Sequence, residues 1–355
     1  MSAHQHVVSD DPVVEDLLLG ILDLVREAGG WFAPELRLHA AAGQISIDRV
    51  TGEGPLLHIP EPLWVRVDAF EWGNLDGQLT VLGVPDDVGD LELAMAFLQA
   101  GLTNQCDRLR WLQASHPALA PDLESATIEA MRAFLPGWRA REHSVVDVLW
   151  ATRCFRMPMS RETAPQRVLV PLVDLLNHHG EGASGALIDQ SFHVDTRQPC
   201  GTAECALDYG MGRDALEMAA IYGFADASAT RAHSAPMELH VDDTAVRVDA
   251  VVRSSSGAPL AGEVSVTDNG IVLRGLTFAR GSLTDLAAKM AEQTAISMTM
   301  ASDVLNAVLV ENRRLTDALI ATCASQRTPA ASTIMGAAAV HREILLRSAR
   351  VDELI

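Results

Sequence analysis

The sequence predicts an α+β fold, with short twisted sheets interrupted by a helical insert and followed by a mainly helical C-terminal domain. Apolar residues recur at helical spacing in a block at about 86–145 and again over 281–351. Short apolar segments broken by Gly, Pro and Asp, which are typical of strands, occupy the stretch 36–84. A length of 355 residues suggests two domains, and we place them at 1–225 and 226–355.

The N-terminal part begins with a helix start signal. Asp11 can cap the first turn and Pro12 suits the first helical position, so we expect a helix of about 16 residues that stops at Gly29-Gly30. Short strands are then predicted for ELRLHAA, GQISIDRV, GPLLHIPEPLWVRVD and GQLTVLGV.

The insert is predicted to hold several helices. Its helical segments are DLELAMAFLQAGL, CDRLRWLQA, DLESATIEAMRAFL and SVVDVLWATRCF, with Pro117, Pro121 and Pro136 as breaks. Strands resume in RVLVPLV, SFHVD and AECALDY, and a helix follows in RDALEMAAIYGF. A Gly-rich loop, HHGEGASGA, is expected after the first of these strands.

The C-terminal domain is predicted to combine short strands at 236–276 with helices at 281–351. Asp242-Asp243 and Asn269-Gly270 supply turn chemistry for two hairpins. The apolar pattern after the last strand fits either one long helix or two, and a final helix follows the break SQRTPAA.

Charge argues against a nucleic-acid partner. Acidic residues outnumber basic ones 47 to 27, giving a formal net charge of −20, whereas binding a polyanion requires Lys and Arg to neutralise phosphates. An acidic surface suits a basic partner, although acidity that only maintains solubility explains the charge equally well.

Cysteine usage and hydropathy indicate a cytoplasmic protein. The five cysteines show no pairing or His/Cys spacing typical of zinc, so reduced thiols and no metal site are expected. The N-terminus lacks the basic start and apolar core of a signal peptide, and no run approaches the roughly 18 apolar residues of a membrane span. We therefore expect no membrane partner.

Two short motifs stand out for their residue types. Asn177-His178 comes after an apolar strand, a position at which such a pair by itself is typical of a loop cap. Tyr209 and Tyr222 are the only tyrosines, lie thirteen residues apart and are each followed by glycine. They could be amphipathic core residues, but their scarcity and their neighbours favour a site.

Four motifs in one order carry a resemblance. The patterns S-R-x-F, D-x-x-N-H-S, G-E-E-v-x-i-x-Y-G and Y-G-F occur here as TRCF, DLLNHH, GTAECALDYG and YGF. In this order the chain resembles the SET-domain protein methyltransferases, in the branch of the RuBisCO large-subunit lysine methyltransferase and the actin-histidine methyltransferase. The segment GEGPLLHIPEPLWV resembles the strand that follows the cofactor loop of that family. The resemblance spans Leu18 to about Phe224.

The resemblance implies a methyltransferase that uses S-adenosyl-L-methionine to modify a side-chain nitrogen, that of lysine or histidine, in a basic protein or peptide held by the C-terminal helices. It assigns Tyr209 to the methyl-transfer centre and Asp174 to orienting Arg153 or the acceptor. The residues that it assigns to the cofactor are Arg153, Asn177, His178, Tyr222, Phe224 and Gly43.

Three positions depart from the family pattern. Ala41-Ala42-Gly43 retains one glycine of the family's Gly-x-Gly loop, Ala215 replaces an asparagine, and His179 replaces the serine of Asn-His-Ser. His179 reads either as an exposed loop residue or as a substrate contact. These departures keep two alternatives open, namely an inactive SET-like module that binds a basic peptide and a methyltransferase acting on a small molecule or a biosynthetic peptide.

Overall fold

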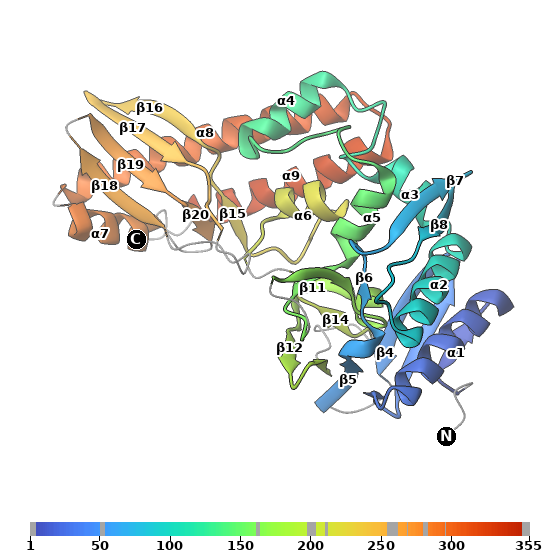
Figure 1. Ribbon diagram of the computed structural model, residues 1–355. Coiled ribbons are helices and arrows are strands. Elements are labelled where there is room, and N and C mark those ends of the chain that lie inside the picture. Colours follow the sequence, from blue (N-terminus) through green and yellow to red (C-terminus); the bar gives the residue numbers. More distant parts are fainter. Residues whose placement is uncertain are drawn as a thin grey trace. The chain divides into compact units, whose positions relative to one another are not determined.

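The computed structural model combines helices with several short sheets (Figure 1). It describes residues 5–49, 54–160, 164–196, 204–209, 212–253, 262–267, 269–279, 283–294 and 296–349. The predicted fold class is confirmed, because the chain mixes α and β structure in short sheets and has a helical C-terminal region. Within the described residues, no helix has the length and hydropathy of a membrane-crossing segment.

The chain divides into two compact units. Unit 1 comprises Met1–Gln113 and Ser144–Tyr209, and unit 2 comprises Ala114–His143 and Gly210–Ile355. This division differs from the expected boundary at residue 225, since the second half of the helical insert groups with the C-terminal part of the chain. Unit 1 ends at Tyr209, in the segment that carries the first tyrosine motif.

Unit 1 contains most of the short sheets. Its strands are β1 (Val7–Ser9), β2 (Trp31–Phe32), β3 (Leu36–Ala41), β4 (Gln44–Arg49), β5 (Gly54–Pro60), β6 (Val65–Arg66), β7 (Glu71–Leu75), β8 (Gln78–Gly83), β9 (Phe155–Met157), β10 (Gln166–Leu169), β11 (Asn177–Ala183), β12 (Gly185–Ile188), β13 (Ser191–Thr196) and β14 (Ala206–Leu207). Its helices are α1 (Pro12–Glu27), α2 (Asp90–Gln105), α3 (Arg108–Ser115, which continues into unit 2), α5 (Val145–Arg153) and the short 3-10 turns η2 (Glu61–Leu63) and η3 (Val173–Leu175).

Local sequence explains the N-terminal elements of unit 1. Asp11 caps α1, its carboxylate accepting hydrogen bonds from the N–H groups of Val13 and Val14 at 2.8 and 3.4 Å, and Pro12 occupies the first helical position, as predicted. The buried face of α1 holds residues at helical spacing, and the strands pair in the orders β1-β3-β4 and β12-β13-β5-β2. The four predicted strands between 36 and 84 are present as β3, β4, β5 and β8, accompanied by the shorter strands β6 and β7.

A tight turn between β3 and β4 explains the single glycine of the Ala-Ala-Gly motif. Ala41 pairs with Gln44, so the loop has two residues, and both adopt the left-handed region, with φ 51° at Ala42 and φ 77° at Gly43. Hairpin turns of this length favour such values because they match the twist of the strands. A Cβ on Gly43 would also lie 3.2 Å from the carbonyl oxygen of Cys106.

Unit 2 places helices beside a small sheet. Its elements are α4 (Ser125–Phe134), α6 (Ala215–Tyr222), β15 (Arg231–His233), β16 (Met237–Val241), β17 (Thr244–Asp249), β18 (Glu263–Thr267), β19 (Gly270–Arg274), β20 (Thr277–Ala279), α7 (Leu283–Thr294), α8 (Met298–Ala324) and α9 (Pro329–Ala349). The open choice between one long helix and two resolves as two, with Ser297 capping α8 through a hydrogen bond from Met300 N–H. In Figure 1, α8 and α9 pack along each other and β16, β17, β19 and β18 form one sheet.

A buried network of charged groups surrounds the start of α6. Asp214 caps the helix by accepting the N–H of Glu217 at 2.9 Å, and its other oxygen accepts the backbone N–H of His233 at 2.9 Å. The side chain of His341, which is fully buried, lies 3.3 Å from the same oxygen. Arg253 forms an ion pair with Glu217. Two carboxylates are thus shared among one arginine and two histidines.

This network predicts a pH dependence of stability. Burial lowers the pKa of His233, but the carboxylates of Glu217 and Asp214 outweigh it and raise that pKa above its ordinary value. Burial raises the pKa of Asp214, but His341 and His233 outweigh it, so this pKa lies well below the usual range. Arg253 and the carboxylate partners also face these groups.

The sign of each contribution follows from the direction of its shift. The stability from His233 is complete below its unfolded pKa of about 6.5 and is lost as the pH rises through the folded value. The stability from Asp214 is complete above about pH 4 and is lost as the pH falls toward its folded value. Urea unfolding from pH 4 to 9 should therefore show greatest stability between roughly pH 4 and 6.5 from this network.

His233→Gln is expected to flatten the decline above pH 6.5, whereas His240→Gln, at an exposed position on β16, should leave the profile unchanged. Equal profiles for wild type and His233→Gln would contradict the assignment.

Candidate functional site

Two strands bring the Asn-His motif beside the first tyrosine. β11 and β14 pair in parallel, with Asn177 opposite Ala206 and His178 opposite Leu207, so Tyr209 follows the paired segment by two residues. The expected Gly-rich loop after His178 is a strand, since β11 continues to Ala183. Residues about thirty positions apart in the chain are therefore neighbours because of strand pairing.

Tyr209 is held at both its backbone and its ring. Its N–H donates to Nδ1 of His178 at 3.1 Å, which leaves any ring proton of a neutral imidazole on Nε2. The two rings lie 5.2 Å apart at an angle of 49°. The phenol hydroxyl donates to the carbonyl oxygen of Leu176. A phenol oxygen that donates its hydrogen in this way can also act as a hydrogen-bond acceptor.

Arg153 and Asp174 form an ion pair whose carboxylate is buried. Nη1 of Arg153, at the end of α5, donates to the backbone oxygen of Asp174 at 2.9 Å and to its carboxylate Oδ2 at 3.2 Å. The Asp174 side chain is fully buried, and burial raises its pKa although Arg153 and Arg108 lower it. Its second oxygen, Oδ1, is buried and has no hydrogen-bond partner among the described residues.

Arg108 is a member of this cluster that the sequence did not single out. It is the first residue of α3 and is 8% exposed, and its Nη1 has no hydrogen-bond partner in the described part of the chain. Burial, followed by repulsion from Arg153, lowers the pKa of Arg108 to about 10, although the carboxylate of Asp174 raises it. Helical spacing could predict that one face of α3 is buried, but not that a charged residue would be on it.

Backbone strain marks the turn that carries Asp174. Leu172, which precedes η3, is fully buried and adopts φ 66°, a region that non-glycine residues rarely occupy. Such a conformation costs about 1–3 kcal/mol and persists where the surrounding packing enforces it. Strain of this kind concentrates at functional sites, and here it lies two residues from the buried carboxylate.

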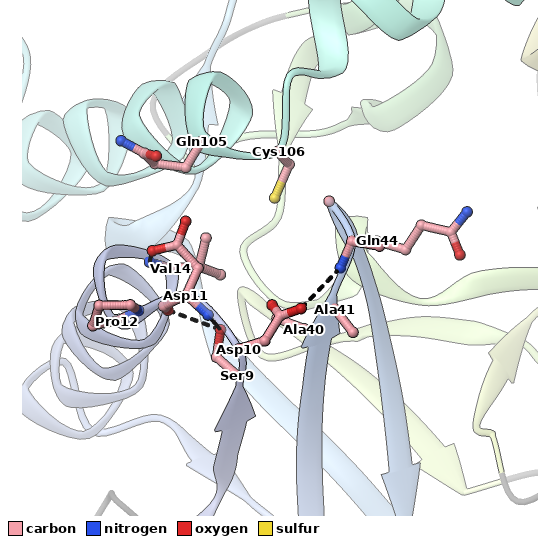
Figure 2. A pocket seen from close by; sticks show the side chains of 12 residues that line it. Ser9, Asp10, Asp11, Pro12, Val14, Ala40, Ala41, Gln44, Gln105 and Cys106 are labelled. Carbon is pink, nitrogen blue, oxygen red and sulfur yellow. Dashed lines mark hydrogen bonds between the residues drawn. The ribbon is translucent and has the colours of Figure 1, made fainter.

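Asn177 and Gly43 have separate surroundings within unit 1. The side-chain amide of Asn177 donates to the carboxylate of Glu204. Gly43 lines a cavity of about 360 Å³ between the β3–β4 hairpin, the start of α1 and the end of α2. Figure 2 shows the sulfur of Cys106 directed into this space, opposite the carboxylate of Asp10. Of the predicted site residues, only Gly43 lines it.

The second tyrosine motif belongs to unit 2. The rings of Tyr222 and Phe224 lie 6.2 Å apart, and Gly223 between them ends α6 with φ 77°. The carbonyl of Ile221 is in hydrogen-bond contact with Nε2 of His116 at 3.1 Å, and a Cβ on Gly223 would lie 2.6 Å from that ring. The glycine of this motif is thus required by a helix end, whereas the glycine after Tyr209 lies outside the described residues.

The contacts within unit 1 fit the polar end of S-adenosylmethionine. The cluster offers two guanidinium groups, a buried carboxylate oxygen without a partner and a phenol oxygen that can accept a hydrogen bond. An α-amino acid group and a reacting nitrogen together require both hydrogen-bond donors and hydrogen-bond acceptors.

No protein-family profile and no curated protein matches this sequence. Among solved structures, the SET domain of LSMT bound to lysine and AdoHcy is similar with TM-score 0.41 and 11% identity, covering 97% of this chain and 92% of that chain. Rubisco LSMT bound to sinefungin and monomethyllysine gives TM-score 0.40 and 11% identity over the same shares, 97% and 92%. The SET domain of LSMT bound to MeLysine and AdoHcy gives TM-score 0.37 and 13% identity, again over 97% and 92%.

Proposed function

We propose that this protein is an S-adenosylmethionine-dependent methyltransferase that modifies a side-chain nitrogen, most simply that of lysine, in a protein or peptide. The observation that carries the proposal is the position of Tyr209 beside Asn177-His178, with its hydroxyl hydrogen held by Leu176. The four sequence motifs in one order supply the reaction class. The acidic net charge of −20 suits a basic substrate.

Bound S-adenosylmethionine would supply an electrophilic methyl group on a sulfonium. Arg153, Asn177 and His178 would hold its polar end. Tyr222, Phe224 and Gly43 are proposed as further cofactor residues. Methyl transfer of this type is an in-line displacement, so the chain contributes mainly alignment, which can supply about 7–11 kcal/mol of the barrier.

Tyr209 would align the acceptor. Its oxygen can accept an N–H from the amine and so direct the nitrogen lone pair along one line, because the ring and the hydroxyl are fixed by His178 and Leu176. A lysine must first lose its proton, which costs roughly 4–5 kcal/mol at pH 7 for a pKa of about 10.4. Burial of the amine in an apolar channel would lower that cost. No separate strong base is needed.

Calorimetry with S-adenosylhomocysteine and a labelled-methyl assay on lysine-containing peptides test the proposal. Wild type should bind the cofactor product and label at least one peptide. Tyr209→Phe should bind S-adenosylhomocysteine within about threefold of wild type and lose about 100-fold or more of its methyl transfer, the scale seen when one aligned hydrogen bond is removed from an active site.

Absence of S-adenosylhomocysteine binding by wild type would reject the methyltransferase. Peptide binding that is salt-sensitive and indifferent to S-adenosylhomocysteine would instead support the inactive module. Full activity of Tyr209→Phe would leave an enzyme but remove Tyr209 from the reaction.

A further inference from the structure

Unit 1 contains a buried cluster whose charges do not balance. Arg108 and Arg153 share a single buried carboxylate, Asp174, and that carboxylate is hydrogen-bonded to Arg153. Arg108 is left buried with its Nη1 unpaired among the described residues. A buried guanidinium nitrogen without a hydrogen-bond partner is unfavourable, so a ligand that offers it an acceptor is expected.

The same cluster also lacks a donor. Oδ1 of Asp174 is buried and has no hydrogen-bond partner within the described chain, although Oδ2 is bonded to Arg153. A carboxylate oxygen accepts only, so its complement is an N–H or O–H group. The cluster therefore presents one unfilled cationic donor and one unfilled anionic acceptor.

A zwitterionic α-amino acid group has the complementary pair. Its carboxylate suits the planar fork of an arginine, which can donate two parallel hydrogen bonds, and its ammonium suits a carboxylate oxygen. A phosphate or a simple carboxylate would fill Arg108 but leave Oδ1 of Asp174 without a donor. The pair of unfilled groups thus favours an amino acid group over a simple anion.

We propose that Arg108 and Oδ1 of Asp174 form a subsite for a zwitterionic α-amino acid group, and that Arg108 receives its carboxylate. This rests on the proposed function, in which the group is the methionine end of S-adenosylmethionine. Arg108 is then a second arginine for the cofactor, contributed by α3, in addition to Arg153 from α5.

Two probes that differ only in the amino acid part test the subsite. S-adenosylhomocysteine carries the zwitterion, whereas 5′-methylthioadenosine lacks it. Arg108→Met should weaken binding of S-adenosylhomocysteine by about 10- to 100-fold, the scale of a hydrogen bond to a charged group. Binding of 5′-methylthioadenosine should stay within about twofold of wild type. The matched control is Arg110→Met, because Arg110 is on the same helix with its side chain 75% exposed, and both affinities should be unchanged.

Stability supplies an independent readout. Because Nη1 of Arg108 has no hydrogen-bond partner in the described chain, Arg108→Met should unfold at a temperature no lower than wild type. A lower midpoint would show that Arg108 has a structural partner and would overturn the proposal. Failure of Arg108→Met to fold would also overturn the proposal. The second variant, Arg108→Lys, keeps the charge and should retain part of the preference for S-adenosylhomocysteine over 5′-methylthioadenosine.

The outcomes separate the subsite from the proposed function. Wild type that fails to bind S-adenosylhomocysteine rejects the methyltransferase itself. If wild type binds S-adenosylhomocysteine but Arg108→Met weakens binding of both probes equally, or of neither, the subsite is rejected and the proposed function stands. Free L-lysine is a third probe, which distinguishes the source of the zwitterion. If Arg108→Met loses lysine binding but binds S-adenosylhomocysteine as wild type does, the subsite belongs to the acceptor and the cofactor assignment is overturned.

Discussion

Replacing Asp214 by alanine is expected to destabilise unit 2 by about 3–5 kcal/mol, the usual effect of removing one partner from a buried ionic group. The substitution removes the cap of α6, the acceptor for the backbone N–H of His233 and the carboxylate 3.3 Å from His341. His341 and the start of α6 would therefore both lose their negatively charged partner. For a unit of this size the midpoint of thermal unfolding should fall by about 10 °C.

Differential scanning calorimetry of the full chain measures this effect as a shift in the midpoint of unfolding. Asp317→Ala is the matched control, since Asp317 pairs with Arg342 at an exposed site. Exposed pairs contribute about 1 kcal/mol or less, so that variant should unfold close to wild type. A loss below 1 kcal/mol in Asp214→Ala would show that the network does not depend on this carboxylate.

Replacing Asp174 by alanine is expected to destabilise unit 1 by a similar 3–5 kcal/mol. Arg153 would lose its ion-pair partner, and Arg108 would lose the buried negative charge that opposes its repulsion by Arg153. If Oδ1 of Asp174 receives the ammonium of the cofactor's amino acid group, as proposed above, binding of S-adenosylhomocysteine should be lost in the same variant. Chemical unfolding and calorimetric titration measure the two effects separately.

A double variant tests the electrostatic reason for that loss. If two neighbouring positive charges cause the instability, Asp174→Ala combined with Arg108→Met should recover part of the stability lost in Asp174→Ala, giving a coupling energy above 0.5 kcal/mol. The exposed carboxylate of Asp68, which pairs with Arg167, provides the control, because Asp68→Ala should have an effect of about 1 kcal/mol or less. Strictly additive effects would exclude a shared charge cluster.

Sequence signals predicted well those helices and strands that depend on interactions between near neighbours in the chain. Asp11 and Pro12 specified the start of α1, and short apolar segments specified the strands β3 and β4. The break between α7 and α8 was left open because Ser297 can either cap a helix or sit within one, and only packing decides between the two.

The candidate site was predicted in part. Asp174, Asn177, His178 and Tyr209 were selected from motifs, and strand pairing then placed the last three side by side. Arg108 was not selected, because it differs from Arg110 only in the direction that its side chain takes on α3. The sequence around the two residues gives no sign that one is buried against an ion pair and the other is exposed.

The sequence by itself determined the main helices and strands, the cap of α1, and the residue types available for chemistry, because these depend on neighbours within a few positions. Only the tertiary structure decided which charges are buried together. Arg108, Arg153, Asp174 and Tyr209 are far apart in the chain and act on one another only after folding brings them into one low-dielectric cluster. The same reason explains why Asp214, which caps α6, becomes the centre of a charge network in unit 2.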